Sequence, residues 1–298
     1  MMRCPACLLL LLLSLPVARA AEQPVLDALD QLSPRLLLGV NRAGGQVLTG
    51  ALAWPDSLEP AIAWREALCP GPGRADGGSP DDVDARLGLQ VLVLDGGRRA
   101  LNQYGRELAW QGRQELPASL DELPRPELLA VSAGRALLVA DPRGGVALKR
   151  PGEDWRPLLD YARAGLLRPR ALEAVGERVF LMDGDGAGRR LLLCGTDGAW
   201  RRAWPAPGLL ALHRGGEGDL LLLWRRGEGL ELERWPLAAR LEELPGESFA
   251  VARFAAPADL ERHPPRDFLW LPAPAGGPGR LLLARRGAPA LLLAPGAP

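Results

Sequence analysis

Two aspartates in one glycine-rich turn, Asp183 and Asp185, come closest to the spacing of a metal site. In Asp183-Gly184-Asp185-Gly186 they match the first two carboxylates of a calcium-binding loop. Such a loop carries a glutamate at its twelfth position, where this chain has Cys194. The glycines are also typical of a tight hairpin turn, because glycine adopts positive φ angles. The segment therefore predicts either a plain hairpin or an incomplete calcium site with Asp183 and Asp185 as candidate ligands.

A second group of carboxylates, Asp81, Asp82 and Asp84, lies in the segment 70–86, which is rich in proline, glycine and aspartate. Oxygen ligands on a flexible segment could gather a divalent cation, and simple solvation of the three acids is the alternative. Ser79-Pro80-Asp81-Asp82 has the serine cap and first-turn proline of a helix start. We expect an inserted loop here, with one helical turn.

The chain has only two histidines, and they are far apart. His213 ends an apolar run, which favours a structural role, whereas His263 lies in a polar loop and is expected to be solvated. Neither belongs to an H-x-H or H-E-x-x-H motif, and the chain after residue 20 has no C-x-x-C motif, so a zinc site is not predicted. A G-x-S-x-G motif and a Walker loop are also absent from the sequence. The sequence therefore nominates no catalytic residue and no cofactor.

The first twenty residues have the three parts of a secretory signal peptide. Arg3 lies near the start, an apolar run extends from Leu8 to Val17, and Ala18-Arg19-Ala20 matches a small-x-small cleavage site. The apolar run is too short for a membrane-spanning helix, which needs roughly 20 residues. We expect cleavage near Ala20 and a periplasmic or secreted protein without a membrane span in the mature chain. An uncleaved N-terminal anchor is the alternative.

Cys69 and Cys194 are the two cysteines that remain after this cleavage. An oxidising compartment would allow them to form a disulfide. The alternative is two separate thiols, with Cys194 as a small buried apolar residue in a strand.

The charge balance argues against a nucleic-acid partner. Removal of Arg3 and Arg19 leaves 34 basic and 36 acidic residues, and no block of five like charges occurs. Lys149 is the only lysine among the basic residues, a bias typical of GC-rich genomes. The arginines are scattered along the chain, so codon usage explains them more simply than bidentate anion binding does.

A short phrase recurs along the chain: a turn, three to five apolar residues, a glycine-bearing turn and a second apolar run. Its phase points are Leu36–Val40, Leu128–Val131, Leu172–Val175, Leu209–Leu212 and Phe249–Val251. A repeat of about 40 residues indicates one supersecondary unit used several times. We interpret residues 21–298 as a single β-propeller of four-stranded antiparallel blades, six most simply, with five or seven as alternatives. Two diverged units would occupy residues 35–126 and four clearer units residues 127–293, with residues 255–266 inserted inside the last unit.

The tryptophans repeat with a similar period. Trp110, Trp155 and Trp200 are 45 residues apart, and Trp235 falls near the same phase. Aromatic residues at a fixed phase are expected to pack between neighbouring blades, since each sheet must bury both faces.

Two segments in which an acidic turn is followed by glycine and tryptophan resemble quinoprotein-like (PQQ-type) repeats. They are Asp95-Gly96-Gly97 with Gly105–Trp110, and Thr196-Asp197-Gly198-Ala199-Trp200. The resemblance implies a propeller fold. Families with this repeat include quinone-dependent dehydrogenases and a lipoprotein of outer-membrane assembly. This chain has no vicinal cysteine pair like the former and no lipidation cysteine like the latter, so neither activity is carried over.

The expected function is that of an exported binding or scaffolding module for an envelope protein or a small extracellular ligand. The alternative is a propeller enzyme, a hydrolase, lactonase or quinone-dependent oxidoreductase, with its site at the channel mouth. Loops on one face of the ring should contact the ligand, and we expect these at residues 159–170, 183–189, 205–208 and 272–279.

Overall fold

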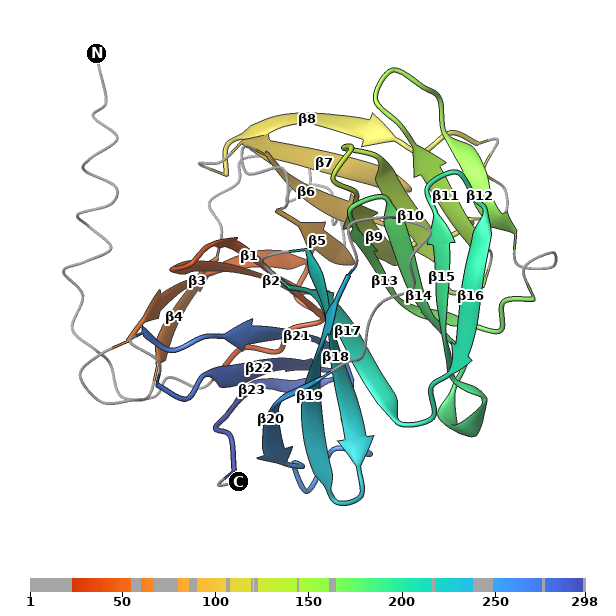
Figure 1. Cartoon of the computed structure of the whole chain (residues 1–298). Helices are drawn as coiled ribbons and strands as arrows, with labels where there is room; N and C mark the ends of the chain where they lie inside the picture. The colour runs from red at the N-terminus through yellow and green to blue at the C-terminus, as the bar shows by residue number, and fades with distance from the viewer. Residues whose placement is uncertain are drawn as a thin grey trace, which may run out of the picture.

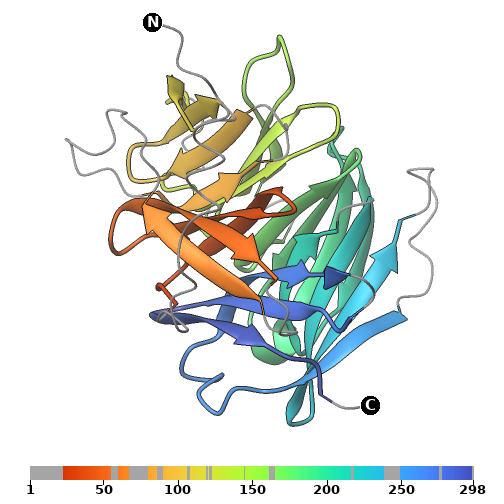
Figure 2. The same cartoon turned by 90° about the vertical axis from the view of Figure 1, so that its left-hand side faces the viewer.

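Six antiparallel sheets surround a central axis in the computed structural model of the chain (Figures 1 and 2). The structure describes residues 23–54, 60–66, 80–85, 90–105, 108–118, 120, 123–143, 145–160, 165–215, 218–237, 249–274 and 277–296. Within these residues five sheets have four strands and the sixth has three. The prediction of an all-β, six-bladed propeller is confirmed.

The blades follow one another along the chain. Blade 1 comprises β1 (Ala28–Ser33), β2 (Leu36–Asn41), β3 (Gln46–Ala53) and β4 (Ala61–Glu66); blade 2 comprises β5 (Asp82–Asp84), β6 (Gln90–Asp95), β7 (Ala100–Gly105) and β8 (Trp110–Glu115); blade 3 comprises β9 (Leu128–Val131), β10 (Leu137–Asp141), β11 (Gly145–Lys149) and β12 (Arg156–Asp160). Blade 4 comprises β13 (Pro169–Val175), β14 (Arg178–Asp183), β15 (Arg190–Gly195) and β16 (Trp200–Pro205); blade 5 comprises β17 (Leu209–Arg214), β18 (Asp219–Arg226), β19 (Gly229–Pro236) and β20 (Phe249–Ala255); blade 6 comprises β21 (Pro265–Leu271), β22 (Arg280–Arg285) and β23 (Ala288–Leu293). The first strand of each blade lies nearest the axis, and a short 3₁₀ turn (Gly186–Gly188) joins β14 to β15.

Burial explains why the middle strands read as continuous apolar runs rather than alternating ones. All six residues of β14 are buried, and only the first residue of β6 is partly exposed. Such strands are covered on both faces by neighbouring blades. The outer strand β8 is mostly exposed, which explains its polar sequence.

The apolar core is divided among the blade interfaces. Six clusters of buried side chains occur in the described chain, one between each pair of adjacent blades. Phe180 and Phe268 are among the largest fully buried side chains. Each blade therefore depends on both neighbours for its burial.

The ring closes where blade 6 meets blade 1, which Figure 2 shows side by side. The backbone N–H of Leu29 in β1 donates to the carboxylate of Asp267 in β21 at 2.7 Å. Val25 forms a bridge with Pro289 beside β23, and the N–H of Ala290 donates to the carbonyl of Pro24 at 2.8 Å. The chain before β1 therefore begins the fourth strand that blade 6 otherwise lacks among the described residues.

The predicted phase of the repeat is correct for three units and wrong for two. Leu128–Val131, Leu172–Val175 and Leu209–Leu212 are first strands, but Leu36–Val40 lies in a second strand and Phe249–Val251 in a fourth. Residues 256–264 therefore join blade 5 to blade 6, and the predicted insertion inside the last unit is wrong. Apolar runs of similar length do not distinguish the strands of one blade from each other.

Only some of the periodically spaced tryptophans pack between neighbouring blades. Trp110, Trp155 and Trp200 lie in or just before fourth strands, whereas Trp235 lies in a third strand. Trp155 and Trp235 pack against clusters between blades, as predicted. Trp110 is 39% exposed, so its predicted role as a spacer is wrong.

The predicted leader, residues 1–20, lies outside the described residues, so the signal peptide and the cleavage near Ala20 stay predictions. In the described part of the chain, no helix has the length and apolar character needed to cross a membrane.

Replacing Leu26 should weaken the closure. Its side chain is fully buried in the cluster between blades 6 and 1. Leu26→Ala is expected to lower the free energy of unfolding by about 2–5 kcal/mol, because it leaves a cavity where the ring closes. Urea denaturation measures the change. Leu167, which is 56% exposed, is the control, and Leu167→Ala should stay within about 0.5 kcal/mol. Equal losses in both variants would contradict this account of closure.

Candidate functional site

A cavity of about 520 Å³ lies on the axis and is lined by residues from all six innermost strands. Since β1, β5, β9, β13, β17 and β21 converge there, the cavity is the central channel of the propeller. Charged groups dominate the lining: nine arginines, nine carboxylates and His213. The channel combines ionic groups that lie far apart in the sequence.

The interior of the channel is acidic, and its carboxylates link neighbouring blades. Asp30 of β1 accepts the N–H of Ala85 in blade 2 at 2.5 Å. Asp82 of β5 accepts the N–H of Leu129 in blade 3 at 2.7 Å, and burial raises its pKa well above the usual range, with the charge of Asp267 adding to the shift. These carboxylates satisfy backbone donors that face the channel, so their first role is structural.

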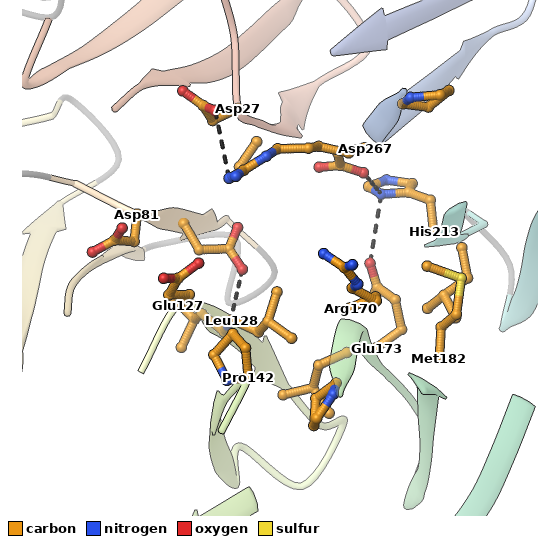
Figure 3. A pocket seen from close by; sticks show the side chains of 18 of the residues that line it. Asp27, Asp81, Glu127, Leu128, Pro142, Arg170, Glu173, Met182, His213 and Asp267 are labelled. Atoms are coloured by element: carbon orange, nitrogen blue, oxygen red, sulfur yellow. Dashed lines mark hydrogen bonds and ion pairs between the residues drawn. The ribbon is translucent and has the colours of Figure 1, made fainter. Parts of the chain in front are cut away.

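His213 of β17 completes this interior layer (Figure 3). Its Nδ1 lies 3.5 Å from carboxylate oxygens of both Glu173 in β13 and Asp267 in β21. Burial lowers the pKa of His213, but the hydrogen bond and charge of Asp267, with Glu173 and Asp30, outweigh it and raise the pKa to about 9. The imidazole is therefore charged at neutral pH and bridges blades 4, 5 and 6.

The channel mouth, the end at which the innermost strands begin, is rich in arginine. Eight of the nine lining arginines lie there, in loops before the first strands, in turns after the second strands, or at the second residue of β13 and β21. In Figure 3, Arg170 projects from β13 toward the channel. Four carboxylates share this end: Asp27, Asp81, Glu127 and Asp185.

Two of these arginines hold ion pairs between blades. Arg42 contacts Asp81 at 2.8 Å and Glu127 at 2.9 Å, so it joins blade 1 to the starts of blades 2 and 3. Arg266 lies 3.5 Å from Asp27. Burial, followed by repulsion from Arg42, lowers the pKa of Arg266.

The candidate metal ligand Asp183 is fully buried at the end of β14. Its carboxylate accepts the backbone N–H groups of Leu167 and Arg168 and contacts the guanidinium of Arg190 at 2.8 Å. The hairpin turn is present, with Gly184 at φ +83°. These contacts tie the loop before blade 4 to the blade.

Asp185 projects into the channel mouth instead. It contacts three arginines, Arg168, Arg170 and Arg189. No group of three or more histidine, cysteine, aspartate or glutamate side chains with the geometry of a metal site occurs among the described residues. Whether Asp183 and Asp185 bind a metal stays an untested prediction.

The segment of Asp81, Asp82 and Asp84 differs from its prediction. Residues 82–84 form the inner strand β5, and all three carboxylates contact protein groups, Asp84 through the N–H of Val131 in blade 3 at 3.0 Å. The predicted helical turn at residues 79–82 is therefore wrong for its described end. Pairing with β6 outweighs the local helix-start signal.

The structure describes one of the two cysteines that were predicted either to pair or to stay separate. Cys194 is buried in the cluster between blades 3 and 4, and burial raises its pKa to about 12. Cys69 lies outside the described residues, so the disulfide stays untested.

His213 is structural, as predicted, and also lines the channel. Nδ1 of His263 lies 2.9 Å from the carbonyl of Arg286, so its imidazole has a protein partner.

Three of the four predicted ligand loops lie at the channel mouth. The described part of residues 159–170 supplies Arg168 and Arg170 to it, residues 183–189 supply Arg189, and residues 205–208 join blade 4 to blade 5 at the same end. The described part of residues 272–279 follows the end of β21 and precedes β22, at the opposite end, so that prediction is wrong.

The mouth arginines are the residues that the sequence interpretation missed. Because arginines are common throughout this sequence, the position of a single arginine does not indicate a site. Several of them stand beside a proline at the start of an inner strand, in Arg125-Pro126, Arg168-Pro169-Arg170 and Pro265-Arg266. This recurring pair would have marked them.

No protein-family model matches the chain, and its sequence matches no curated protein. Solved structures do match its fold. A Bacteroides thetaiotaomicron protein of unknown function has a TM-score of 0.56 at 11% identity, with 93% of this chain and 70% of that chain covered. Virginiamycin B lyase from Staphylococcus aureus has a TM-score of 0.51 at 10% identity, covering 90% and 83%. Regucalcin from Agrobacterium tumefaciens, described as a calcium-binding protein, has a TM-score of 0.52 at 11% identity, covering 93% and 92%. At such identities the likeness shows the propeller fold alone.

The charge on His213 predicts a pH-dependent stability. Because its pKa is raised from 6.5 to about 9 in the folded protein, its contribution is complete below pH 6.5 and is lost as pH rises through about 9. Wild type should therefore lose more free energy of unfolding between pH 6.5 and 9 than His213→Gln does. Chemical denaturation across this range measures the slopes. His263→Gln is the control and should keep the wild-type slope; a wild-type slope in His213→Gln as well would refute the assignment.

The two aspartates of the turn are expected to behave differently. Asp183→Asn should lower the free energy of unfolding by about 1–3 kcal/mol, because three donors lose a buried anionic acceptor. Asp185→Asn should change it by about 1 kcal/mol at most, since the Asp185 side chain is half exposed. Thermal melting with and without calcium measures both effects. A calcium-dependent rise in the wild-type melting temperature that Asp185→Asn abolishes would establish a metal site instead.

Proposed function

We propose that this protein is an exported binding module whose ligand, a small extracellular molecule or a segment of an envelope protein, enters the mouth of the central channel. The observation that carries the proposal is the cavity on the axis, to which every blade contributes. Its volume of about 520 Å³ lies within the range of sites for small molecules, roughly 300–1,000 Å³.

The lining supports specific binding. Arg42 and Asp81 are held in place by ion pairs between blades, and the interior carboxylates are fixed by backbone donors. Groups positioned in advance lose little entropy when a ligand binds. Apolar side chains also reach the cavity, including Leu128 of β9 and Met182 of β14 (Figure 3).

Export is the other half of the proposal and rests on the N-terminal sequence. The segment from Arg3 to Ala20 has the charge, the apolar run and the cleavage pattern of a secretory signal. In a periplasm or outside the cell, the channel would meet envelope proteins and extracellular solutes.

The enzyme alternative has one specific observation in its favour. His213 lines the channel and is charged at neutral pH, so it has a proton to donate. A hydrolase, lactonase or quinone-dependent oxidoreductase would have its site at the mouth of the channel that His213 lines. Among the solved structures of the same fold, one is named a lyase and one a calcium-binding protein. Loss of turnover in His213→Gln, with ligand binding retained, would favour the enzyme.

Filling the channel should abolish binding. Leu128→Trp places a larger side chain in the cavity, and native mass spectrometry after incubation with an envelope extract should detect a bound species on wild type but not on this variant. The matched control is Leu158→Trp, because Leu158 packs against the same apolar cluster but does not line the cavity. Equal retention by both variants, with unchanged melting, would place the ligand elsewhere and refute the proposal.

A further inference from the structure

Arginines outnumber carboxylates among the residues that line the channel mouth. Eight arginines face four carboxylates there. Arg42 engages two of the four, Asp81 and Glu127, and Arg266 lies near a third, Asp27. Of the four carboxylates, only Asp185 forms ion pairs with any of the six remaining arginines.

Three arginines share this single carboxylate. Arg170 contacts one oxygen of Asp185 through Nε at 2.9 Å, Arg189 lies 3.9 Å from the same oxygen, and Arg168 lies 3.7 Å from the other. Burial lowers the pKa of Arg189; the charge of Asp185 raises it and that of Arg170 lowers it further. One negative charge therefore stands against three positive ones on blade 4.

Arg125, Arg143 and Arg286 make no ion pair with any acidic residue that the structure describes. Their guanidinium groups are exposed at the mouth. The backbone beneath two of them is fixed: Asp141, at the end of β10, accepts the N–H groups of both Arg125 and Arg143, the latter at 2.7 Å. Asp141 thus positions two arginines from separate loops beside each other, as Asp183 does for Arg168 in the next blade.

We propose that the mouth binds a small organic polyanion, one that carries two or more carboxylate or phosphate groups. This inference rests on the proposed function and names its ligand class. Guanidinium groups form bidentate hydrogen bonds with both kinds of oxyanion. Arg125, Arg143 and Arg286, which have no ion pair with a described acidic residue, lie on blades 3 and 6. Arg168, Arg170 and Arg189, which share Asp185, lie on blade 4. A ligand with a single charge would therefore reach only some of these six arginines.

The interior of the channel sets the orientation. The carboxylates of Asp30, Glu173 and Asp267 line it below the mouth, and His213 is their cation. An anionic group is repelled from this layer and attracted to the arginine layer. The ligand therefore binds across the mouth and does not pass down the axis.

Asp185 competes with such a ligand for Arg168, Arg170 and Arg189. Removing its charge should strengthen anion binding, whereas removing free arginines should weaken it. The two changes have opposite signs, which a loss of folding cannot produce.

Isothermal titration calorimetry tests the inference with citrate and pyrophosphate as probes. The double variant Arg143→Gln/Arg286→Gln should weaken binding by roughly tenfold per arginine, and Asp185→Asn should strengthen it several-fold. The control is Arg202→Gln/Arg253→Gln, which removes the same charge from the exposed outer strands β16 and β20 and should leave affinity unchanged. Binding of citrate alone would identify a carboxylate ligand, and binding of pyrophosphate alone a phosphate ligand.

The inference is overturned if neither probe binds, or if the channel and control variants weaken binding equally. Its failure is distinguishable from failure of the proposed function. If the species that Leu128→Trp displaces proves uncharged, the channel is still a binding site and only the polyanion assignment falls.

Discussion

Hydrogen bonds from one innermost strand to the carboxylate of its neighbour are the contacts on which the ring depends. An inner strand pairs on one side only, so some of its N–H groups face the channel. Asp267, Asp30 and Asp82 accept such groups across three successive interfaces. Since an unsatisfied buried donor costs about 1–3 kcal/mol, these three aspartates are needed for the stability of the ring whether or not a ligand binds.

The same requirement divides the channel into layers of opposite charge. The acids that accept the N–H groups facing the channel lie within the inner strands, and His213 is the counter-ion for Glu173 and Asp267. Loops and turns at the mouth are free of this constraint and carry arginines such as Arg143 and Arg286. Carboxylates that satisfy the backbone inside the channel and exposed arginines at its mouth are therefore compatible on one scaffold.

The fold could be predicted from sequence because its signal is local and repeated. Strand-length apolar runs and glycine turns indicate blades wherever they occur, although Phe249–Val251 shows that they do not reveal which strand of a blade is seen. The site could not be predicted in the same way. Arg125 and Arg286 lie far apart in the sequence, in blades 3 and 6, and line the same cavity only when the ring closes. The Asp183 segment forms the hairpin turn that was one of its two predicted alternatives, but its carboxylate also positions a loop, which no spacing rule indicates.

The bridge between Val25 and Pro289 has a consequence for the order of folding. Leu29 and Asp267, which join the first and last blades, are 238 residues apart. During synthesis the final blade can assemble only after almost the entire polypeptide has emerged, and until then the first blade exposes one apolar face. Bringing such distant segments together is slow because the connecting chain must lose much of its freedom. Until the last blade forms, the first blades keep an apolar face exposed to solvent. During this time aggregation or binding to a chaperone competes with folding.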